Sequence, residues 1–153
     1  MKIYSLQTTQ SLSISPEQAW DFFSKPENLS ELTPPDMDFK IISDPEKEMF
    51  PGQIITYKIG VLPGIKRTWV TEIKNVEVMK SFIDEQRFGP YKFWYHKHSF
   101  EKNGSGIVMK DNIQYAVPFG LIGRVLHKLF IRNKLEKIFK YRFDYLNRKF
   151  NEE

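Results

Sequence analysis

The feature that most constrains the fold is a long helical pattern that directly follows a series of strand-like segments. Apolar residues recur at helical spacing through residues 121–150, and no Pro or Gly interrupts the pattern after Gly123. The expected core stripe consists of Ile122, Val125, Leu126, Leu129, Leu135, Ile138, Phe139, Phe143 and Leu146. A helix with one apolar stripe needs a second layer to cover it, and the preceding strands supply that layer.

Short apolar or alternating runs bounded by turn residues predict these strands. The first begins near Ile3, and five more follow at residues 53–61, 65–76, 81–87, 91–101 and 107–117. Their connections are short and rich in Gly, Pro and Asn, which favours antiparallel hairpins over crossover helices. The sequence therefore predicts an α+β fold in which a curved antiparallel sheet wraps around a long C-terminal helix.

Two short helices are expected between the first and second strands. Ser15, Pro16 and Gln18 form a capping-box start for a helix that runs to Phe23. A second helix over residues 27–32 ends at the prolines that follow it. These helices are expected to close one end of the fold, and the absence of repeats or linkers predicts one domain over residues 1–153.

Composition excludes several classes of site. The chain has no Cys, so it has no disulfides, thiol nucleophiles or Cys-ligated metal centres. Aromatic residues make up 15% of the chain, which suits a thick core or the wall of a pocket. The N-terminus turns polar too soon for a signal peptide, and no apolar run approaches the roughly 18 residues of a membrane span, so a cytoplasmic protein is expected.

Positive charge is concentrated in the last helical segment. Residues 119–149 contain nine basic and two acidic residues, a net charge of +7, whereas the rest of the chain carries −3. Such a helix face is either simply solvated or attracted to an anionic membrane surface or an acidic protein. The absence of a recognised motif argues against nucleic-acid binding.

Several motifs carry a resemblance to a known superfamily. They are Phe82-Ile83-Asp84-Glu85-Gln86, Gly89-Pro90-Tyr91 and Trp94-Tyr95-His96-Lys97-His98-Ser99-Phe100, with Asp111, Tyr115, Pro118, Phe119 and Gly120 after them. With the order of elements, they resemble the helix-grip fold of the START-related (SRPBCC, polyketide cyclase/dehydrase-like) superfamily. More narrowly, they resemble a bacterial subgroup of uncharacterised SRPBCC proteins, some of which carry the name cell division inhibitor. The resemblance implies a cavity for lipids, sterols, polyketides or similar molecules, and supplies no universal catalytic motif.

The strand at residues 91–101 carries the most informative polar residues. A period of two places Trp94, His96, His98 and Phe100 on one face, and the two large aromatic residues predict that this face points inward. Buried imidazoles need hydrogen-bond partners, which Asp111 and Tyr115 of the next strand can supply. The predicted ligand-binding wall consists of Tyr57, Trp69, Gln86, Trp94, His96, His98, Phe100, Asp111, Tyr115 and Phe119.

Three interpretations of this polar group remain open. It is a structural network, a recognition site for the polar end of an apolar ligand, or a catalytic or metal-binding centre. A His-x-His strand with a carboxylate nearby suits a metal, but no third ligand stands at a diagnostic spacing, so no metal or cofactor is expected. His127 is interpreted as structural or solvated.

The leading hypothesis is binding or carriage of a small hydrophobic ligand without catalysis. The first alternative is a cyclase, dehydratase or hydrolase type of enzyme that uses His96, His98 and Asp111. The second alternative is a protein-interaction module with a filled interior. A pocket with convergent polar groups favours the first two hypotheses over the third.

Overall fold

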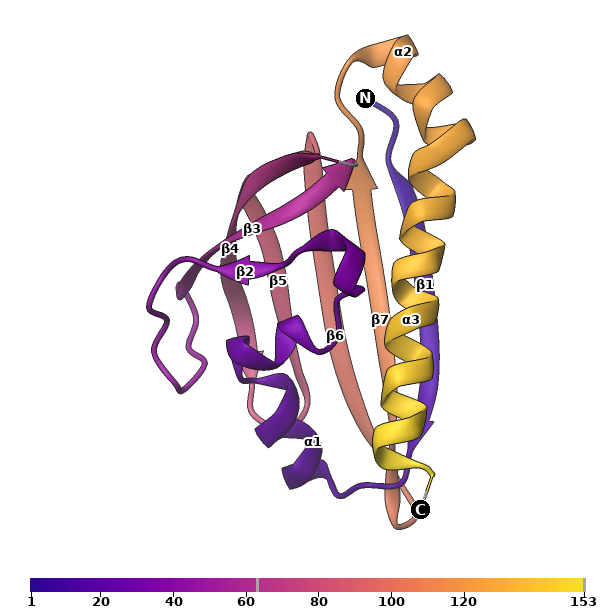
Figure 1. Ribbon diagram of the computed structural model, residues 1–153. Helices are drawn as coiled ribbons and strands as arrows, with labels where there is room; N and C mark the ends of the chain where they lie inside the picture. The colour runs from indigo at the N-terminus through magenta and orange to yellow at the C-terminus, as the bar shows by residue number, and fades with distance from the viewer. Residues whose placement is uncertain (63, 153) are drawn as a thin grey trace.

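The computed structural model describes residues 1–62 and 64–152, apart from the side chain of Leu62, and it contains the predicted curved antiparallel sheet (Figure 1). Seven strands lie in the order β1-β7-β6-β5-β4-β3-β2. Their bounds are β1 Tyr4–Leu12, β2 Lys40–Ile41, β3 Ile54–Leu62, β4 Ile65–Glu77, β5 Ser81–Phe88, β6 Phe93–Asn103 and β7 Gly106–Ala116. The six predicted strands are confirmed, and the two-residue strand β2 was not predicted.

Tight hairpins set the register that positions the interior side chains. Asn103 pairs with Gly106 across a two-residue turn, where Gly104 adopts a φ of 60° that favours glycine. This register places His98 of β6 opposite Asp111 of β7. On the other side of β6, His96 lies opposite Asp84 of β5. Strand β1 closes the order by pairing antiparallel with β7.

One long helical segment follows β7 and has three parts. They are α2 (Gly120–Leu126), the π-helical segment η3 (His127–Ile131) and α3 (Arg132–Phe150). Helix α3 lies along the β1 and β7 side of the sheet (Figure 1). Of the predicted core stripe, Leu135, Phe139 and Leu146 are buried here, so the prediction is confirmed at these positions. It is wrong for Phe143, which is 44% exposed, and Arg142 is buried instead.

The predicted stripe is wrong for the first half of the helical segment. Ile122, Val125 and Leu129 are 69%, 58% and 55% exposed, and Leu126 is exposed as well. Helix α2 continues past the end of β7, where the sheet offers no layer to cover it (Figure 1). The buried residues of α2 and η3 are instead Gly123 and His127.

The first short helix forms as predicted, and the second is shorter and tighter. In α1 (Pro16–Phe23), Ser15 accepts a hydrogen bond from the Gln18 backbone, and the Gln18 side chain accepts one from Ser15. The second is a 3-10 turn, η1 (Pro26–Ser30), and another, η2 (Pro35–Met37), follows it. In Figure 1 α1 and η1 lie across the lower end of the sheet.

The interior contains two apolar clusters. The first includes Leu12, Phe22, Phe23, Phe82, Phe100 and Leu146. The second includes Trp69, Trp94, Ile113, Tyr115, Leu135 and Phe139. Along β6, Trp94 belongs to the second cluster and Phe100 to the first, so His96 and His98 lie between them. Among the described residues, no helix has the length and apolar character that crossing a bilayer requires.

Candidate functional site

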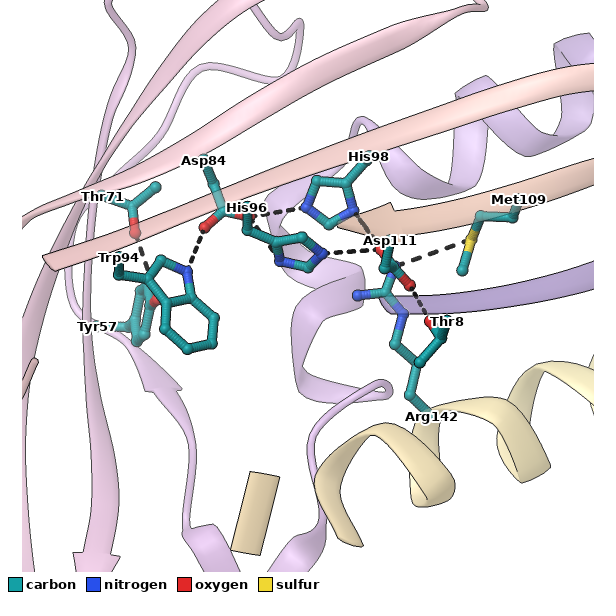
Figure 2. A network of polar contacts seen from close by, with 10 residues as sticks. All are labelled: Thr8, Tyr57, Thr71, Asp84, Trp94, His96, His98, Met109, Asp111 and Arg142. Atoms are coloured by element: carbon teal, nitrogen blue, oxygen red, sulfur yellow. Dashed lines mark hydrogen bonds and ion pairs between the residues drawn. The ribbon is translucent and has the colours of Figure 1, made fainter. Parts of the chain in front are cut away.

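Two histidines lie between two carboxylates at the centre of the fold (Figure 2). His96 Nε2 is 2.8 Å from Asp111 Oδ1, and His96 Nδ1 is 3.2 Å from Asp84 Oδ2. His98 faces the same oxygens, with Nε2 2.7 Å from Asp84 Oδ2 and Nδ1 3.0 Å from Asp111 Oδ1. The two ring centroids are 3.7 Å apart. Each imidazole therefore bridges the two carboxylates.

Three further side chains contact the two acids, one through an ion pair and two through hydrogen bonds. Arg142 of α3 places Nη2 3.4 Å from Asp111 Oδ1. Thr8 of β1 donates to Asp111 Oδ2 at 3.3 Å, and the Trp94 indole donates to Asp84 Oδ1 at 3.1 Å. All four carboxylate oxygens thus have partners, as burial requires. We call Asp84, His96, His98, Asp111 and Arg142 the polar cluster.

Burial and charge act against each other in the polar cluster. Burial raises the pKa of Asp111, but Arg142 and the two histidines hold it well below its usual range. Burial likewise raises the pKa of Asp84, and His96 and His98 bring it below its ordinary value. Burial lowers the pKa of His96, but the two carboxylates raise it above its ordinary value of 6.5. Arg142 and the two histidines thus favour the ionised form of the buried acids, and the acids in turn favour the protonated form of His96.

The inward orientation predicted for the β6 face is confirmed. His96 and His98 are each 4% exposed, and Asp111 is 1% exposed. The predicted pairing of a buried histidine with Asp111 is also confirmed. Asp84 is the more accessible of the two acids in the polar cluster, since its side chain remains 20% exposed against 1% for Asp111.

The predicted aromatic residues of the wall lie on both sides of the polar cluster. Tyr57, Trp69 and Trp94 form a continuous aromatic group, with ring centroids 5.8 Å and 5.2 Å apart in that order. Phe100 is buried in the first apolar cluster instead. All four of these aromatic residues therefore lie on the inner face of the sheet, as predicted.

Gln86 and Tyr115 have partners of their own outside the polar cluster. The Gln86 amide donates to Tyr91 O at 2.7 Å and accepts from Tyr91 N at 3.2 Å, so it holds the β5–β6 turn. The Tyr115 hydroxyl lies 2.8 Å from His127 Nε2 rather than beside His96 or His98. Tyr4 stacks on the His127 ring at 3.6 Å, and burial lowers the pKa of this histidine. Of the two interpretations of His127, the solvated one is wrong, because the side chain is buried and hydrogen-bonded.

The prediction that Phe119 shares the interior wall is wrong. Its side chain is 77% exposed, and the residue caps the N-terminus of α2 with a φ of 65°. It follows the last residue of β7 by three positions, so the alternation of the strand no longer determines its direction.

Sequence reasoning missed Asp84 and Arg142. Asp84 shares a strand face with Phe82, so the burial of that aromatic residue could have placed the carboxylate inside. Arg142 lies three residues after Phe139 and four before Leu146, which puts a basic residue within an apolar stripe. Thr8 was missed as well, because nothing in the sequence indicates that β1 pairs with β7.

Two adjoining cavities open between β1 and α3. One, of about 340 Å³, is lined by Leu6, Thr8, Glu136, Phe139, Lys140, Phe143 and Asp144. The other, of about 260 Å³, is lined by Ile3, Tyr4, Ser5, Leu6, Tyr115, His127, Arg132 and Leu135. We call the first the β1–α3 groove; it reaches the polar cluster through Thr8 and lies at the small end of ligand-pocket volumes.

A long helix across a curved antiparallel sheet defines a helix-grip protein of the START-related class. The chain belongs to the family described as polyketide cyclase / dehydrase and lipid transport, whose model matches residues 12–138. A comparison with curated proteins finds no match.

Solved structures share this fold at low sequence identity. A protein from Chromobacterium violaceum is 13% identical with a TM-score of 0.73, over 98% of this chain and 99% of that one. A START superfamily protein from Mycobacterium smegmatis is 13% identical with a TM-score of 0.68, over 94% and 97%. A nucleoside-diphosphate sugar epimerase from Corynebacterium glutamicum is 21% identical with a TM-score of 0.64; the match covers 92% of this chain but only 28% of the epimerase.

Proposed function

We propose that this protein binds and carries a small, largely apolar molecule in the β1–α3 groove, without chemical conversion. The observation that carries the proposal is the groove itself, in which apolar Leu6, Phe139 and Phe143 surround the Thr8 hydroxyl. The exposed charged side chains that complete the lining are those of Glu136, Lys140 and Asp144. A few polar groups within an apolar lining are typical of ligand sites. The lipid-transport part of the family description supports the same class of ligand.

The hydrogen bonding of Thr8 narrows the ligand further. A hydroxyl has one donor and two acceptor positions, and the Thr8 donor points to Asp111 at 3.3 Å. The Thr8 oxygen can therefore accept a hydrogen bond from the ligand, and the ionised Asp111 carboxylate lies directly behind it. A ligand that ends in a hydroxyl group can donate to this acceptor, whereas a carboxylate end is repelled. The proposed ligand class is an apolar alcohol or phenol.

The closed hydrogen bonding of the polar cluster favours carriage over catalysis. Both ring nitrogens of His96 face carboxylate oxygens, and so do both ring nitrogens of His98. A general base needs a free nitrogen within reach of the substrate. The groove meets Thr8 and Phe139 rather than either imidazole.

Competition binding tests the proposal. The neutral fluorescent probe N-phenyl-1-naphthylamine is bound first and then displaced with a medium-chain fatty alcohol or the fatty acid of equal length. We expect the alcohol to compete more effectively. In Thr8→Val, which keeps the shape of the side chain but removes the hydroxyl, this preference for the alcohol should disappear.

A groove-filling variant and a matched surface variant complete this experiment. Leu6→Trp should block probe binding, whereas Phe88→Ala, at a 68% exposed position at the end of β5, should not. Equal probe binding by Leu6→Trp would place the ligand elsewhere. Native mass spectrometry of gently purified protein should recover the carried molecule with its mass unchanged, and a chemically altered product would favour the enzyme alternative.

We also propose that the protein docks on anionic membranes through the exposed face of α2 and η3. Leu121, Ile122, Val125, Leu129 and Phe130 are 74%, 69%, 58%, 55% and 62% exposed. A contiguous apolar face of this kind marks an interaction site. The exposed Arg124 and Lys128 lie in the same segment and complement anionic headgroups.

Vesicle co-sedimentation tests this docking. Binding should require phosphatidylglycerol in phosphatidylcholine vesicles and weaken with added salt. The double variant Ile122→Ser/Leu129→Ser should lose binding, whereas Phe88→Ser should keep it. Equal binding to neutral and anionic vesicles would overturn the electrostatic part of the proposal. A stable dimer that Ile122→Ser/Leu129→Ser dissolves would assign this face to a second copy of the chain instead.

A further inference from the structure

We propose that Asp84, His96 and His98 form a binding site for one divalent transition-metal ion of the zinc type. This inference goes beyond the proposed function and does not rest on it. Two imidazoles and one carboxylate are ligands that such ions accept readily. The site lies at the centre of Figure 2, where the two rings and the Asp84 carboxylate converge.

The donor atoms already have nearly the spacing that a metal requires. Asp84 Oδ2 is 3.2 Å from His96 Nδ1 and 2.7 Å from His98 Nε2. One ligand atom from each residue lies within 4.8 Å of the others. Around a tetrahedral zinc ion with bonds of about 2.0–2.1 Å, ligand atoms stand about 3.3–3.4 Å apart. Small side-chain rotations therefore suffice to admit the ion.

The surroundings of these three residues independently match the outer shell of a metal site. The ring nitrogens that face away from the ion, His96 Nε2 and His98 Nδ1, lie 2.8 Å and 3.0 Å from Asp111 Oδ1. A carboxylate that accepts from the distal N–H of a ligating histidine fixes its tautomer and orientation. Here one carboxylate does so for both histidines.

Trp94 and Arg142 complete this outer shell. The Trp94 indole donates to Asp84 Oδ1 at 3.1 Å, which leaves Oδ2 for the metal. Arg142 Nη2 lies 3.4 Å from Asp111 Oδ1 and 3.5 Å from His98 Nδ1, so its charge stands beside the outer carboxylate and the distal nitrogen of one ligating ring. The partial exposure of Asp84 leaves a fourth coordination position for water or a small ligand.

Stoichiometry and the identity of the ligands are measured on the wild-type protein. Untagged protein is stripped with a chelator, incubated with zinc chloride, separated from free ion and analysed for its metal content. We expect one zinc per chain. The chain has three histidines, so histidine-labelled protein gives three pairs of ring-nitrogen NMR signals. Zinc should shift the signals of His96 Nδ1 and His98 Nε2 and leave those of His127 unchanged.

Three acid-to-amide variants separate the roles of the carboxylates. Asp84→Asn should abolish stoichiometric binding, and Asp111→Asn should weaken it about tenfold to a hundredfold. Asp21→Asn, a matched change at an acid that is 70% exposed, should have no effect. Circular dichroism of the metal-free proteins checks that each variant folds.

Three results would overturn the site. They are no zinc on the wild-type chain, unchanged binding by a folded Asp84→Asn protein, and equal shifts of all three histidines. If Asp84→Asn fails to fold, the ring-nitrogen measurement on the wild-type protein still shows whether His96 and His98 bind the zinc ion.

Discussion

The Arg142 guanidinium lies 3.4 Å from the Asp111 carboxylate and thereby joins the middle of α3 to β7. Arg142 is 7% exposed and Asp111 is 1% exposed. The guanidinium also lies near the rings of Phe23 and Phe139, 5.7 Å and 6.0 Å from their centroids. A buried pair of this kind tolerates the loss of neither partner, because the remaining charge stays in a medium that solvates it poorly.

Arg142→Met should therefore destabilise the protein by about 3 to 5 kcal/mol in urea unfolding. Arg148→Met, on an exposed position of the same helix, should stay within about 0.5 kcal/mol. The double variant Arg142→Met/Asp111→Asn should lose less than the sum of its parts, since it leaves no unpaired charge. Strict additivity would mean that the two groups do not interact.

Leu135→Ala and Leu129→Ala form a matched test of the corrected helix. Leu135 is 4% exposed, so its truncation should cost about 2 to 5 kcal/mol. Leu129 is 55% exposed, so the same change there should cost less than about 0.5 kcal/mol. Chemical denaturation of both variants measures the difference, and equal losses would show that η3 packs against the core after all.

Trp94→Phe and Trp69→Phe isolate the hydrogen bond to Asp84. Both indoles are 7% exposed, but within the described part of the chain Trp69 Nε1 has no partner. The two changes remove the same atoms, whereas only Trp94→Phe deprives Asp84 of a donor. Thermal or urea unfolding should show Trp94→Phe to be more destabilising by about 1.5 to 3 kcal/mol. A larger loss for Trp69→Phe would contradict this.

The opposite pKa shifts of His96 and His127 predict that the free energy of unfolding is highest near pH 6.5, the ordinary pKa of both histidines. The pKa of His96 is raised, so its contribution is complete below pH 6.5 and is lost as pH rises through the folded-state value. The pKa of His127 is lowered by burial, so its contribution is lost as pH falls below 6.5. Unfolding free energies measured across this range should decline on both sides.

Substitution of each histidine separates the decline of the unfolding free energy above pH 6.5 from the decline below it. His96→Gln should flatten the alkaline limb and His127→Gln the acidic limb. Protonation of Asp84 and Asp111 affects a lower range, because their lowered pKa values give stability that is lost only as pH falls below about 4. A free energy of unfolding that rises through pH 7 to 8 in the wild type would contradict the raised pKa of His96.

The sequence predicts the sheet and the burial of one face of β6 because alternation is a local property. The large aromatic residues Trp94 and Phe100 determine which face points inward, and the histidines follow. The same argument cannot place Leu129, because its exposure depends on where the sheet ends relative to the helix. That is a tertiary property, which helical periodicity does not report.

The polar cluster was only half predictable for a related reason. His96, His98 and Asp111 follow from neighbouring strands, whose register a tight turn constrains. Arg142 reaches them from 31 positions beyond Asp111 and becomes a partner only when α3 docks on the sheet. Thr8 joins through the pairing of the first and last strands, whose ends are far apart in the chain.

The wide turn of η3 determines which way α2 faces. In a regular α-helix the 12 positions from Gly123 to Leu135 would leave these residues about 120° out of phase. The π-helical segment absorbs most of this angle, so that Gly123, His127 and Leu135 are all buried. The number of residues in η3 thus determines the direction, around the helix axis, in which the apolar face of α2 points. Deleting Lys128 should restore regular winding while keeping that face outward, whereas straightening the segment at constant length would turn His127 away from Tyr115.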